Sequence, residues 1–234
     1  MTDATSIVFL DFDGTITRGD ATDAILEAFA PATWRGIEDA WLAGQIGSRE
    51  CLAAQMALVT ASDADVNRLL DHVEIEPGFV TLLDVCASHA APVHIVSDGF
   101  DYCIHRILGR PALNLAGRLA ESRIISSHLE PLGGRWRAAF PEPAGGCAHG
   151  CATCKPAAMA RLNATGALAV FVGDGRSDRY AATAADVVFA KGALASDCEQ
   201  ASIPFLRYDT LVDVARGLDR LLAAGVQPRL YREG

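Results

Sequence analysis

Two carboxylates placed two residues apart, at the end of an apolar run, carry the clearest chemical signal in this chain. Asp11 and Asp13 follow residues 7–10, which read Ile-Val-Phe-Leu, and Gly14 and Thr15 come next. Side chains two residues apart on a strand point the same way, and two buried carboxylates side by side repel each other and lose water. A Mg²⁺ ion removes that cost and creates a site for phosphoryl transfer, with one carboxylate as nucleophile and the other as proton donor. Asp and Gly are also common in turns, so the stretch alone fits a plain strand-end turn as well.

Two more positions have groups suited to an anion. Ser97, Asp98 and Gly99 end a second apolar run and precede a helical pattern, where a hydroxyl and backbone amides bind anions. On its own, this pattern fits a simple helix N-cap better. Lys155 precedes Pro156, a residue that suits the first turn of a helix, so the lysine is expected at the helix start. There its ammonium can neutralise phosphate oxygens and the charge of the nucleophile, although a lone lysine is usually solvated surface.

A further acidic loop follows a third apolar run. Residues 171–178 read Phe-Val-Gly-Asp-Gly-Arg-Ser-Asp, the pattern of a strand that leads through a glycine loop into a helix. We expect Asp174 to reach the metal from a neighbouring strand, and Asp178, one turn later, to complete or orient the metal shell. A capped turn is the alternative, but two acidic glycine loops on two buried strands would repel each other without a cation.

The elements that must position these residues alternate along the chain. Short apolar runs typical of strands covered on both faces occur at 6–10, 93–97, 167–173, 187–190 and 205–207. Helical patterns lie between and after them, at 78–89, 100–108, 156–163, 177–184 and 211–223. This alternation predicts an α/β fold whose core is a doubly wound, Rossmann-like parallel sheet.

The segment 16–76 breaks this alternation, because its patterns are helical throughout. Helices are expected at 21–29, 34–42, 49–59 and 63–73, with Ser48, Ser62 and Asp63 as candidate N-caps. An all-helical insert after the first strand predicts a cap domain over the carboxyl edge of the sheet, where open α/β sheets bind ligands. We therefore predict an α/β core made of residues 1–15 and 77–234, and a helical cap made of residues 16–76.

Two smaller features complete the expected fold. A β-hairpin is expected over residues 123–140, turned at residues 132–134 (Leu-Gly-Gly), with Trp136 on the return strand. Trp34 and Trp41 lie two helical turns apart, which favours packing of both rings in the core of the cap.

Composition argues against several other classes of protein. Half of the 234 residues are apolar, which indicates a folded globular chain. The net charge of −9, from 20 basic and 29 acidic residues, argues against a nucleic-acid partner, which needs a basic face. It does not argue against a phosphorylated substrate, because a metal and a few local donors override the global field. No apolar run is long enough to span a membrane and the N-terminus lacks the features of a signal peptide, so we expect the protein in the cytoplasm.

Seven cysteines are expected as free thiols or metal ligands in a reducing compartment. Cys147, Cys151 and Cys154, with His149 among them, offer four soft ligands in eight residues and could form a structural Zn²⁺ site. The same thiols could be redox-sensitive beside Lys155, or pack as small apolar groups under the hairpin. Packing is favoured, because four ligands this close together strain the tetrahedral geometry of zinc.

The order of these motifs resembles that of the haloacid dehalogenase-like phosphatases over nearly the whole chain. The helical insert and its position are similar to those of the phosphoserine-phosphatase-like branch of that family. Within the branch, several stretches resemble the 2-hydroxy-3-keto-5-methylthiopentenyl-1-phosphate phosphatases of methionine salvage. These stretches are Phe29-Ala30-Pro31 with Trp34, residues 96–101, Cys154-Lys155-Pro156 and residues 188–191.

The resemblance implies a role for each motif around the phosphoryl group. Asp11 is expected to attack phosphorus and become an aspartyl phosphate. Asp13 is expected to protonate the leaving alkoxide, and then to take a proton from the water that hydrolyses the intermediate. Ser97 and the amides near Asp98 and Gly99 would hold the phosphoryl oxygens, with their charge offset by the Lys155 ammonium.

The resemblance also implies the metal shell. Mg²⁺ would lie between Asp11, the backbone carbonyl of Asp13, and Asp174, with Asp178 beside it. This agrees with the chemistry that the residues suggest by themselves, because phosphoryl transfer depends mostly on positioning and on neutralising charge.

Two residues depart from the family pattern and bear on the substrate. Phosphoserine phosphatases usually carry a glutamate for the substrate ammonium where this chain has Asp20, and the shorter side chain weighs against phosphoserine. The methionine-salvage enzymes typically have glycine in place of Asp98, where a carboxylate would repel the substrate or contact another group.

We therefore expect a small phosphorylated metabolite as the substrate. The methionine-salvage enol phosphate is the first candidate, and phosphoserine or a phospho-amino-alcohol is the runner-up. The same residues would also serve a phosphotransferase, which passes the phosphoryl group to an acceptor other than water. A non-catalytic regulatory protein is disfavoured, because all four motifs are intact.

Overall fold

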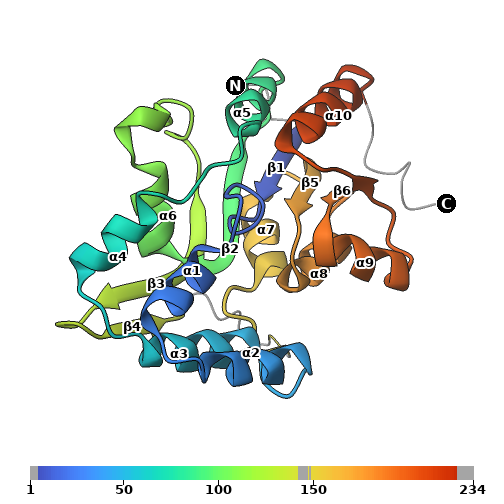
Figure 1. Ribbon diagram of the computed structural model, residues 1–234. Coiled ribbons are helices and arrows are strands. Elements are labelled where there is room, and N and C mark those ends of the chain that lie inside the picture. Colours follow the sequence, from blue (N-terminus) through green and yellow to red (C-terminus); the bar gives the residue numbers. More distant parts are fainter. Residues whose placement is uncertain (1–4, 142–146, 148, 226–234) are drawn as a thin grey trace.

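One mostly parallel sheet forms the centre of the protein. The computed structural model describes residues 5–141, 147 and 149–225, and within them seven strands pair in the order β4-β3-β2-β1-β5-β6-β7 (Figure 1). Neighbouring strands are parallel except β4, which runs antiparallel to β3. The strands are β1 (Ser6–Leu10), β2 (Val93–Phe100), β3 (Ile124–Pro131), β4 (Trp136–Ala139), β5 (Leu168–Gly173), β6 (Val187–Ala190) and β7 (Leu206–Arg207).

Helices connect and cover these strands. The first four fall in the predicted insert, residues 16–76: α1 (Ala21–Phe29), α2 (Trp34–Leu42), α3 (Ser48–Leu58) and α4 (Asp63–Leu70). The others are α5 (Phe79–Ser88), α6 (Asp101–Leu108), α7 (Lys155–Leu162), α8 (Arg179–Ala184), α9 (Gly192–Ala201) and α10 (Leu211–Ala223). The expected α/β architecture is therefore confirmed. None of the helices in the described part of the chain is long and apolar enough to cross a membrane.

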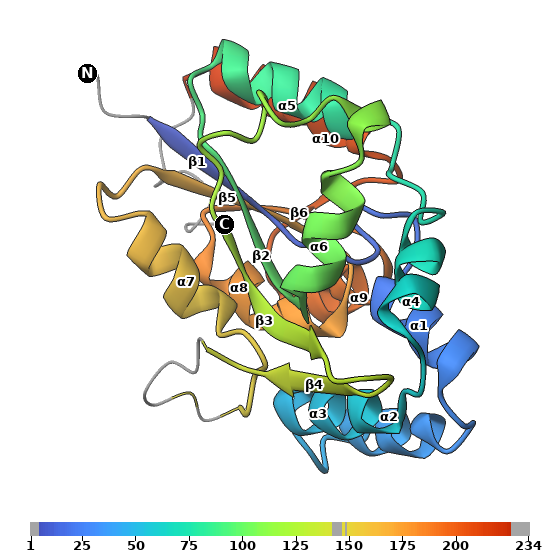
Figure 2. The same cartoon turned by 90° about the vertical axis from the view of Figure 1, so that its left-hand side faces the viewer.

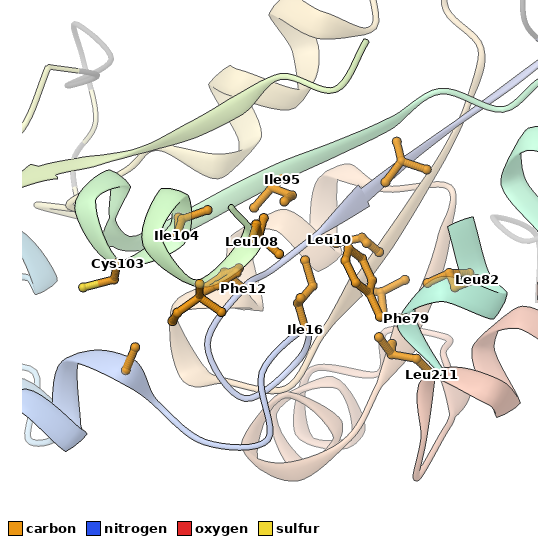
Figure 3. Packing of buried hydrophobic residues seen from close by; sticks show 14 of the residues in the cluster. Leu10, Phe12, Ile16, Phe79, Leu82, Ile95, Cys103, Ile104, Leu108 and Leu211 are labelled. Atoms are coloured by element: carbon orange, nitrogen blue, oxygen red, sulfur yellow. The ribbon is translucent and has the colours of Figure 1, made fainter. Parts of the chain in front are cut away.

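Both faces of the sheet are buried, which explains why β1 is a continuous apolar run. Val8 and Leu10 point to one face and pack in the cluster that includes α5 and α10, and Figure 3 shows Leu10 beside Phe79, Leu82 and Leu211. Ile7 and Phe9 alternate to the other face and join a second cluster formed with α7, α8 and α9. Figures 1 and 2 show these two sets of helices on opposite sides of the sheet.

The helical insert leaves and rejoins the core at one place. Thr17 and Ile75 form an isolated antiparallel bridge, and the amide of Glu76 donates to the carbonyl of Ile16 at 2.8 Å. In Figure 1, α1, α2 and α3 lie on the side to which β1 points, so the insert stands over the carboxyl end of that strand. This arrangement is consistent with a cap made of residues 16–76 and a core made of the remainder, and that division stays a prediction.

The expected hairpin is confirmed as β3 and β4. Its turn runs from Leu132 to Arg135, where the amide of Leu132 donates to the carbonyl of Arg135 at 2.7 Å and Gly133 and Gly134 both have positive φ. The Trp136 indole is buried and donates to the carbonyl of Ala61 at 3.0 Å. The hairpin therefore contacts the helical insert as well as extending the sheet.

Two of the three candidate N-caps in the insert are wrong. Ser62 caps α4 as expected, since its side chain accepts from the amide of Asp65, and Asp63 is then the first helical residue. For α3 the cap position belongs to Gly47, and Ser48 is inside the helix. The Ser48 hydroxyl instead donates to the carboxylate of Asp98 at 2.6 Å, because a charged acceptor from β2 lies within its reach.

Candidate active site

The predicted site residues converge at the carboxyl ends of three adjacent strands. Asp11 follows β1, Ser97 and Gly99 lie near the end of β2, and Asp174 follows β5. Because β1 pairs in parallel with both β2 and β5, these ends meet at one edge of the sheet. Lys155, the first residue of α7, reaches the same place.

Lys155 is the buried centre of this group. Its Nζ atom lies 2.8 Å from Asp11 Oδ1 and 2.5 Å from Asp178 Oδ1, and the residue is only 1% exposed. Burial alone would lower the pKa of this lysine, but the carboxylates of Asp11 and Asp178 outweigh burial and raise the pKa above its ordinary value. The ammonium therefore stays charged and faces the carboxylate that would attack phosphorus.

Three carboxylates gather beside the lysine. One oxygen from each of Asp11, Asp174 and Asp178 lies within 4.8 Å of the others. Burial and, after it, the nearby Asp11 carboxylate raise the pKa of Asp174 to about 6, although a hydrogen bond from Thr15 Oγ1 at 2.7 Å opposes the shift. A group of like charges held this close requires a cation to be stable in its ionised form.

These residues fit a hard divalent cation such as Mg²⁺, which prefers carboxylate oxygens. Asp178 Oδ2 already accepts from the amides of Asp174 and Gly175, at 3.1 and 3.0 Å, and its Oδ1 contacts Lys155. Asp178 is therefore suited to orient its neighbours, while Asp11 and Asp174 are suited to hold the ion.

A glycine keeps the two acidic loops close together. Gly14 has φ +71°, and a Cβ atom built on it would lie 2.2 Å from Asp174 Oδ2. Any larger residue would push Asp174 away from the end of β1, so glycine at this position maintains the close approach of the two acidic loops.

Asp13 has a different environment from Asp11. Its Oδ1 accepts from the amide of Ala21 at 2.8 Å, and its Oδ2 lies next to Gly99, where a Cβ atom would come within 2.3 Å. Burial raises the pKa of Asp13 well above its usual range, and the Asp20 carboxylate adds to this shift. A carboxyl group held in its protonated form beside the nucleophile is suited to donate a proton.

Ser97 and Asp98 differ in how they face the site. Ser97 is buried and its Oγ accepts from the amide of Gly99 at 3.0 Å, which leaves the hydroxyl proton for a ligand. Both carboxylate oxygens of Asp98 bind groups of the protein, because Oδ2 accepts from Ser48 and Oδ1 from the amide of Thr153. Of the two outcomes expected for this carboxylate, contact with another group is the one observed.

A cavity of about 480 Å³ joins the site to the helical insert. Asp20 lines it and also caps α1, since its side chain accepts from the amides of Thr22 and Asp23. Trp34 is buried as expected, but Trp41 lines this cavity, so its prediction as a core residue is wrong. The insert side of the wall carries Arg18, Asp20, Asp23, Glu38, Trp41, Cys51, Leu52 and Gln55.

Most of this insert wall was missed by sequence reasoning. Glu38 and Trp41 stand three residues apart on α2, so a shared helix face was a readable signal for them. Gln55 Nε2 donates to Glu38 Oε2 at 2.8 Å, a contact between α2 and α3 that no local spacing encodes.

The zinc site considered as an alternative at Cys147, Cys151 and Cys154 has no support. In the part of the chain that the structure describes, the only group of three or more potential ligands within 4.8 Å is the acidic one. His149 stacks on Tyr180, with ring centroids 4.0 Å apart. Burial raises the pKa of Cys151 to about 12, so this thiol is protonated in the metal-free protein.

Comparison with known proteins identifies the family. Residues 8–183 match the model of the haloacid dehalogenase-like hydrolases, and the chain belongs to this family. Within it, the protein is a phosphatase.

Two relatives are both named 2-hydroxy-3-keto-5-methylthiopentenyl-1-phosphate phosphatase. The protein from Geobacillus thermodenitrificans is 29% identical over 92% of this chain and 96% of its own length. The protein from Exiguobacterium sp. is 30% identical over 89% of this chain and 94% of its own length.

Solved structures agree on the fold. A substrate-bound phosphoserine phosphatase superimposes with a TM-score of 0.67 at 15% identity, covering 91% of this chain and 98% of its own. A phosphoserine phosphatase described as an analogue of the phospho-aspartyl intermediate also superimposes with a TM-score of 0.67. Its sequence is 14% identical, and the match covers 92% of this chain and 99% of its own.

Proposed function

We propose that this phosphatase is a Mg²⁺-dependent phosphomonoester hydrolase that works through an aspartyl phosphate at Asp11. The observation that carries the proposal is the Lys155 ammonium, buried 2.8 Å from Asp11 and within a group of carboxylates at the edge of the cavity. A neighbour of the same fold is described by its title as an analogue of a phospho-aspartyl intermediate, which supports the same chemistry here.

The first half-reaction transfers the phosphoryl group to the enzyme. A carboxylate oxygen of Asp11 attacks phosphorus, and the bond from phosphorus to the substrate oxygen breaks. Asp13 gives its proton to the leaving alkoxide, which the raised pKa of this carboxyl makes possible at neutral pH. The Ser97 hydroxyl, the Gly99 amide region and Lys155 hold the charged phosphoryl oxygens during transfer.

The second half-reaction returns the enzyme to its starting state. Asp13, now a carboxylate, takes a proton from a water molecule whose oxygen attacks phosphorus. The bond from phosphorus to the Asp11 oxygen breaks, and inorganic phosphate leaves. When bound by Asp11 and Asp174, Mg²⁺ supplies positive charge that offsets the charge of the phosphoryl oxygens and of the carboxylates.

The first substrate candidate is 2-hydroxy-3-keto-5-methylthiopentenyl-1-phosphate. Two relatives of matching length are named for this substrate. Trp41 and Leu52 on the insert side of the cavity provide apolar surface for the leaving group. The seven cysteines are free, which suits catalysis in the reducing cytoplasm.

A second candidate is a phosphate ester whose leaving group carries an amine, such as phosphoserine or a phospho-amino-alcohol. The specific observation is the acidic insert wall, on which Asp20, Asp23 and Glu38 outnumber the single cation of Arg18. Trp41 on the same wall presents an aromatic ring, which also attracts cations.

Steady-state hydrolysis tests both candidates. Release of inorganic phosphate is measured for the enol phosphate, phosphoserine, phosphoethanolamine and ethyl phosphate, each with Mg²⁺ and with EDTA. The proposal predicts the highest kcat/KM for the enol phosphate and loss of turnover with EDTA. A preference for phosphoethanolamine over ethyl phosphate, combined with poor use of the enol phosphate, selects the second candidate. No hydrolysis of any ester with Mg²⁺ present contradicts the proposed function.

A further inference from the structure

The carboxylate of Asp98 joins the helical insert to the core. Its Oδ2 accepts from the hydroxyl of Ser48 at 2.6 Å, and its Oδ1 accepts from the amide of Thr153 at 3.0 Å. Its backbone carbonyl accepts from Ser127 Oγ at 2.9 Å, which fixes the strand end that carries it. One side chain therefore binds the start of α3 and the segment before α7 at the same time.

Ser48 closes the junction from the other side. Its Oγ donates to Asp98 and also accepts from the amide of Ala152 at 2.9 Å. Asp98, Ser48 and residues 152–153 thus form a closed set of three hydrogen bonds, which we call the cap junction. A hydrogen bond to a carboxylate is stronger than one between neutral groups, so the two contacts to Asp98 are the strong members of the set and the bond from Ala152 to Ser48 is the weaker one.

Backbone contacts next to the cap junction show that the two segments are closely docked. A Cβ atom on Gly47 would lie 2.5 Å from the carbonyl oxygen of Gly150. The amide of Arg49 donates to that carbonyl at 3.1 Å, and its guanidinium donates to the carbonyl of Cys151 at the same distance. The first turn of α3 therefore rests directly on residues 150–151.

Each side of the cap junction leads to one part of the active site. On the core side, the carbonyl of Thr153 accepts from the amide of Lys155 at 2.9 Å, and the Lys155 ammonium lies beside Asp11. On the insert side, α3 carries Leu52 and Gln55, which line the cavity where the leaving group would bind. A single carboxylate is thus placed to set the position of Lys155 and of the cavity wall together.

We infer that Asp98 is a positioning residue, which holds α3 and the segment leading to Lys155 in the arrangement needed to bind and transfer the phosphoryl group. It acts through Ser48 and Thr153 and not by contact with the reacting atoms. Its effect on catalysis rests on the proposed function, whereas its effect on the docking of the insert does not.

Amide hydrogen exchange tests the docking without any use of activity. The amide of Thr153 in Asp98→Ala and the amide of Ala152 in Ser48→Ala are expected to exchange about ten-fold faster than in the parent, because each variant removes the acceptor of that amide. Ser62→Ala is the matched control, because it removes a serine hydroxyl from the start of α4 that bonds only within the insert. Unchanged exchange at Ala152 and Thr153 in both test variants overturns the inference.

Kinetics of the same variants test the positioning. Ser48→Ala is expected to raise KM about ten-fold with a smaller effect on kcat, while Asp98→Ala raises KM and also lowers kcat, because it frees the Lys155 segment as well. Asp98→Asn keeps an acceptor for Thr153 and should restore most of kcat. The double variant Asp98→Ala/Ser48→Ala should lose less than the product of the two single losses, since both changes remove the contact between Ser48 and Asp98.

The outcomes of the two experiments are separable. The positioning role is contradicted if the loss of kcat/KM in the double variant equals the product of the two single losses. It is also contradicted if kcat is the same in Asp98→Ala and in the parent. If the parent hydrolyses no phosphate ester, the proposed function fails, and the exchange rates alone still decide whether Asp98 docks the insert on the core.

Discussion

Asp11 and Asp13 leave the same strand two residues apart, yet their surroundings give them opposite chemistry. Asp11, the proposed nucleophile, lies 2.8 Å from the buried ammonium of Lys155. Asp13 lies between Ala21 and Gly99 without a cation of its own, and burial raises its pKa. Two carboxyl groups whose environments differ in this way can divide the roles of nucleophile and acid.

Replacing the proposed acid should separate the two half-reactions. In Asp13→Asn, p-nitrophenyl phosphate should still phosphorylate the enzyme, because its leaving group needs no proton, but hydrolysis of the intermediate loses its base. We expect a burst of p-nitrophenolate close to one equivalent of enzyme, followed by turnover reduced about 100- to 10,000-fold. Stopped-flow absorbance measures both phases.

The matched control for this prediction is Asp84→Asn. Asp84 is a surface carboxylate paired with Arg118, so its loss should leave both phases as in the parent. Steady turnover of Asp13→Asn at the parental rate, on an alkyl phosphate, would show that another group transfers the proton.

At this scale, the sequence predicts the strand-end residues well and the junction residues poorly. Asp11, Ser97 and Asp174 could be placed together because parallel strands bring their carboxyl ends to one edge. The partner of Asp98 could not, because Ser48 approaches it only when the insert folds back over the sheet. Ser48 has the residue type of an N-cap and lies at the start of α3. Its hydroxyl instead donates to the carboxylate of Asp98, which is 50 residues away in the chain.

At the scale of elements, α5 and α10 hold the strands that carry the site. Both helices pack on the face of the sheet that contains Val8 and Leu10, and Figure 3 shows Leu82 of α5 close to Leu211 of α10. The strand end at Asp11 is fixed only as firmly as this layer is packed, because the carboxylate follows Leu10 directly.

Truncating one of these contacts should cost stability. Leu82 is fully buried, so Leu82→Ala removes apolar contacts and leaves a cavity, and we expect a loss of about 2–5 kcal/mol in the free energy of unfolding. Val212→Ala on α10 is the control, because Val212 is 38% exposed and its truncation should change stability by less than about 0.5 kcal/mol. Urea denaturation followed by circular dichroism measures both, and equal stability of the two variants contradicts the packing described.

Element types were easier to predict than element contacts. The continuous apolar runs at residues 6–10 and 167–173 indicated strands covered on both faces, and the helices on both sides confirm this. The contact between Glu38 and Gln55 on the insert wall could not be predicted, because these residues come from different helices whose docking is a tertiary property. Trp41 was placed in the core by its helical spacing, but that spacing does not say which face of α2 turns to the cavity.

At the scale of the whole molecule, core and insert enclose a site that concentrates negative charge. Asp174 has a folded pKa of about 6, above its ordinary value of 3.8, so the metal-free folded state binds more protons than the unfolded chain between these values. The stability that this group contributes is fully present below about pH 4 and is lost as the pH rises through about 6.

The metal-free protein should therefore lose stability over this pH range, and Mg²⁺ should restore it at pH 7. In Asp174→Asn, the metal-free protein should be more stable at pH 7 than the parent, by on the order of 1–2 kcal/mol after allowance for solvent screening. It should also gain little from added Mg²⁺, because one ligand is missing. Thermal unfolding at pH 4 and pH 7, with EDTA and with Mg²⁺, measures these effects. A parent whose Tm does not respond to Mg²⁺ at pH 7 contradicts the metal site.

Trapping the covalent intermediate tests the central claim most directly. The protein is mixed with substrate and Mg²⁺, quenched in acid and treated with borohydride, which reduces an aspartyl phosphate to homoserine, and its peptides are analysed by mass spectrometry. We predict homoserine at position 11 in the parent and none in Asp11→Asn, whose turnover should fall at least about 1,000-fold. Reduction at a different residue, or undiminished turnover by Asp11→Asn, would contradict the assignment of Asp11 as the nucleophile.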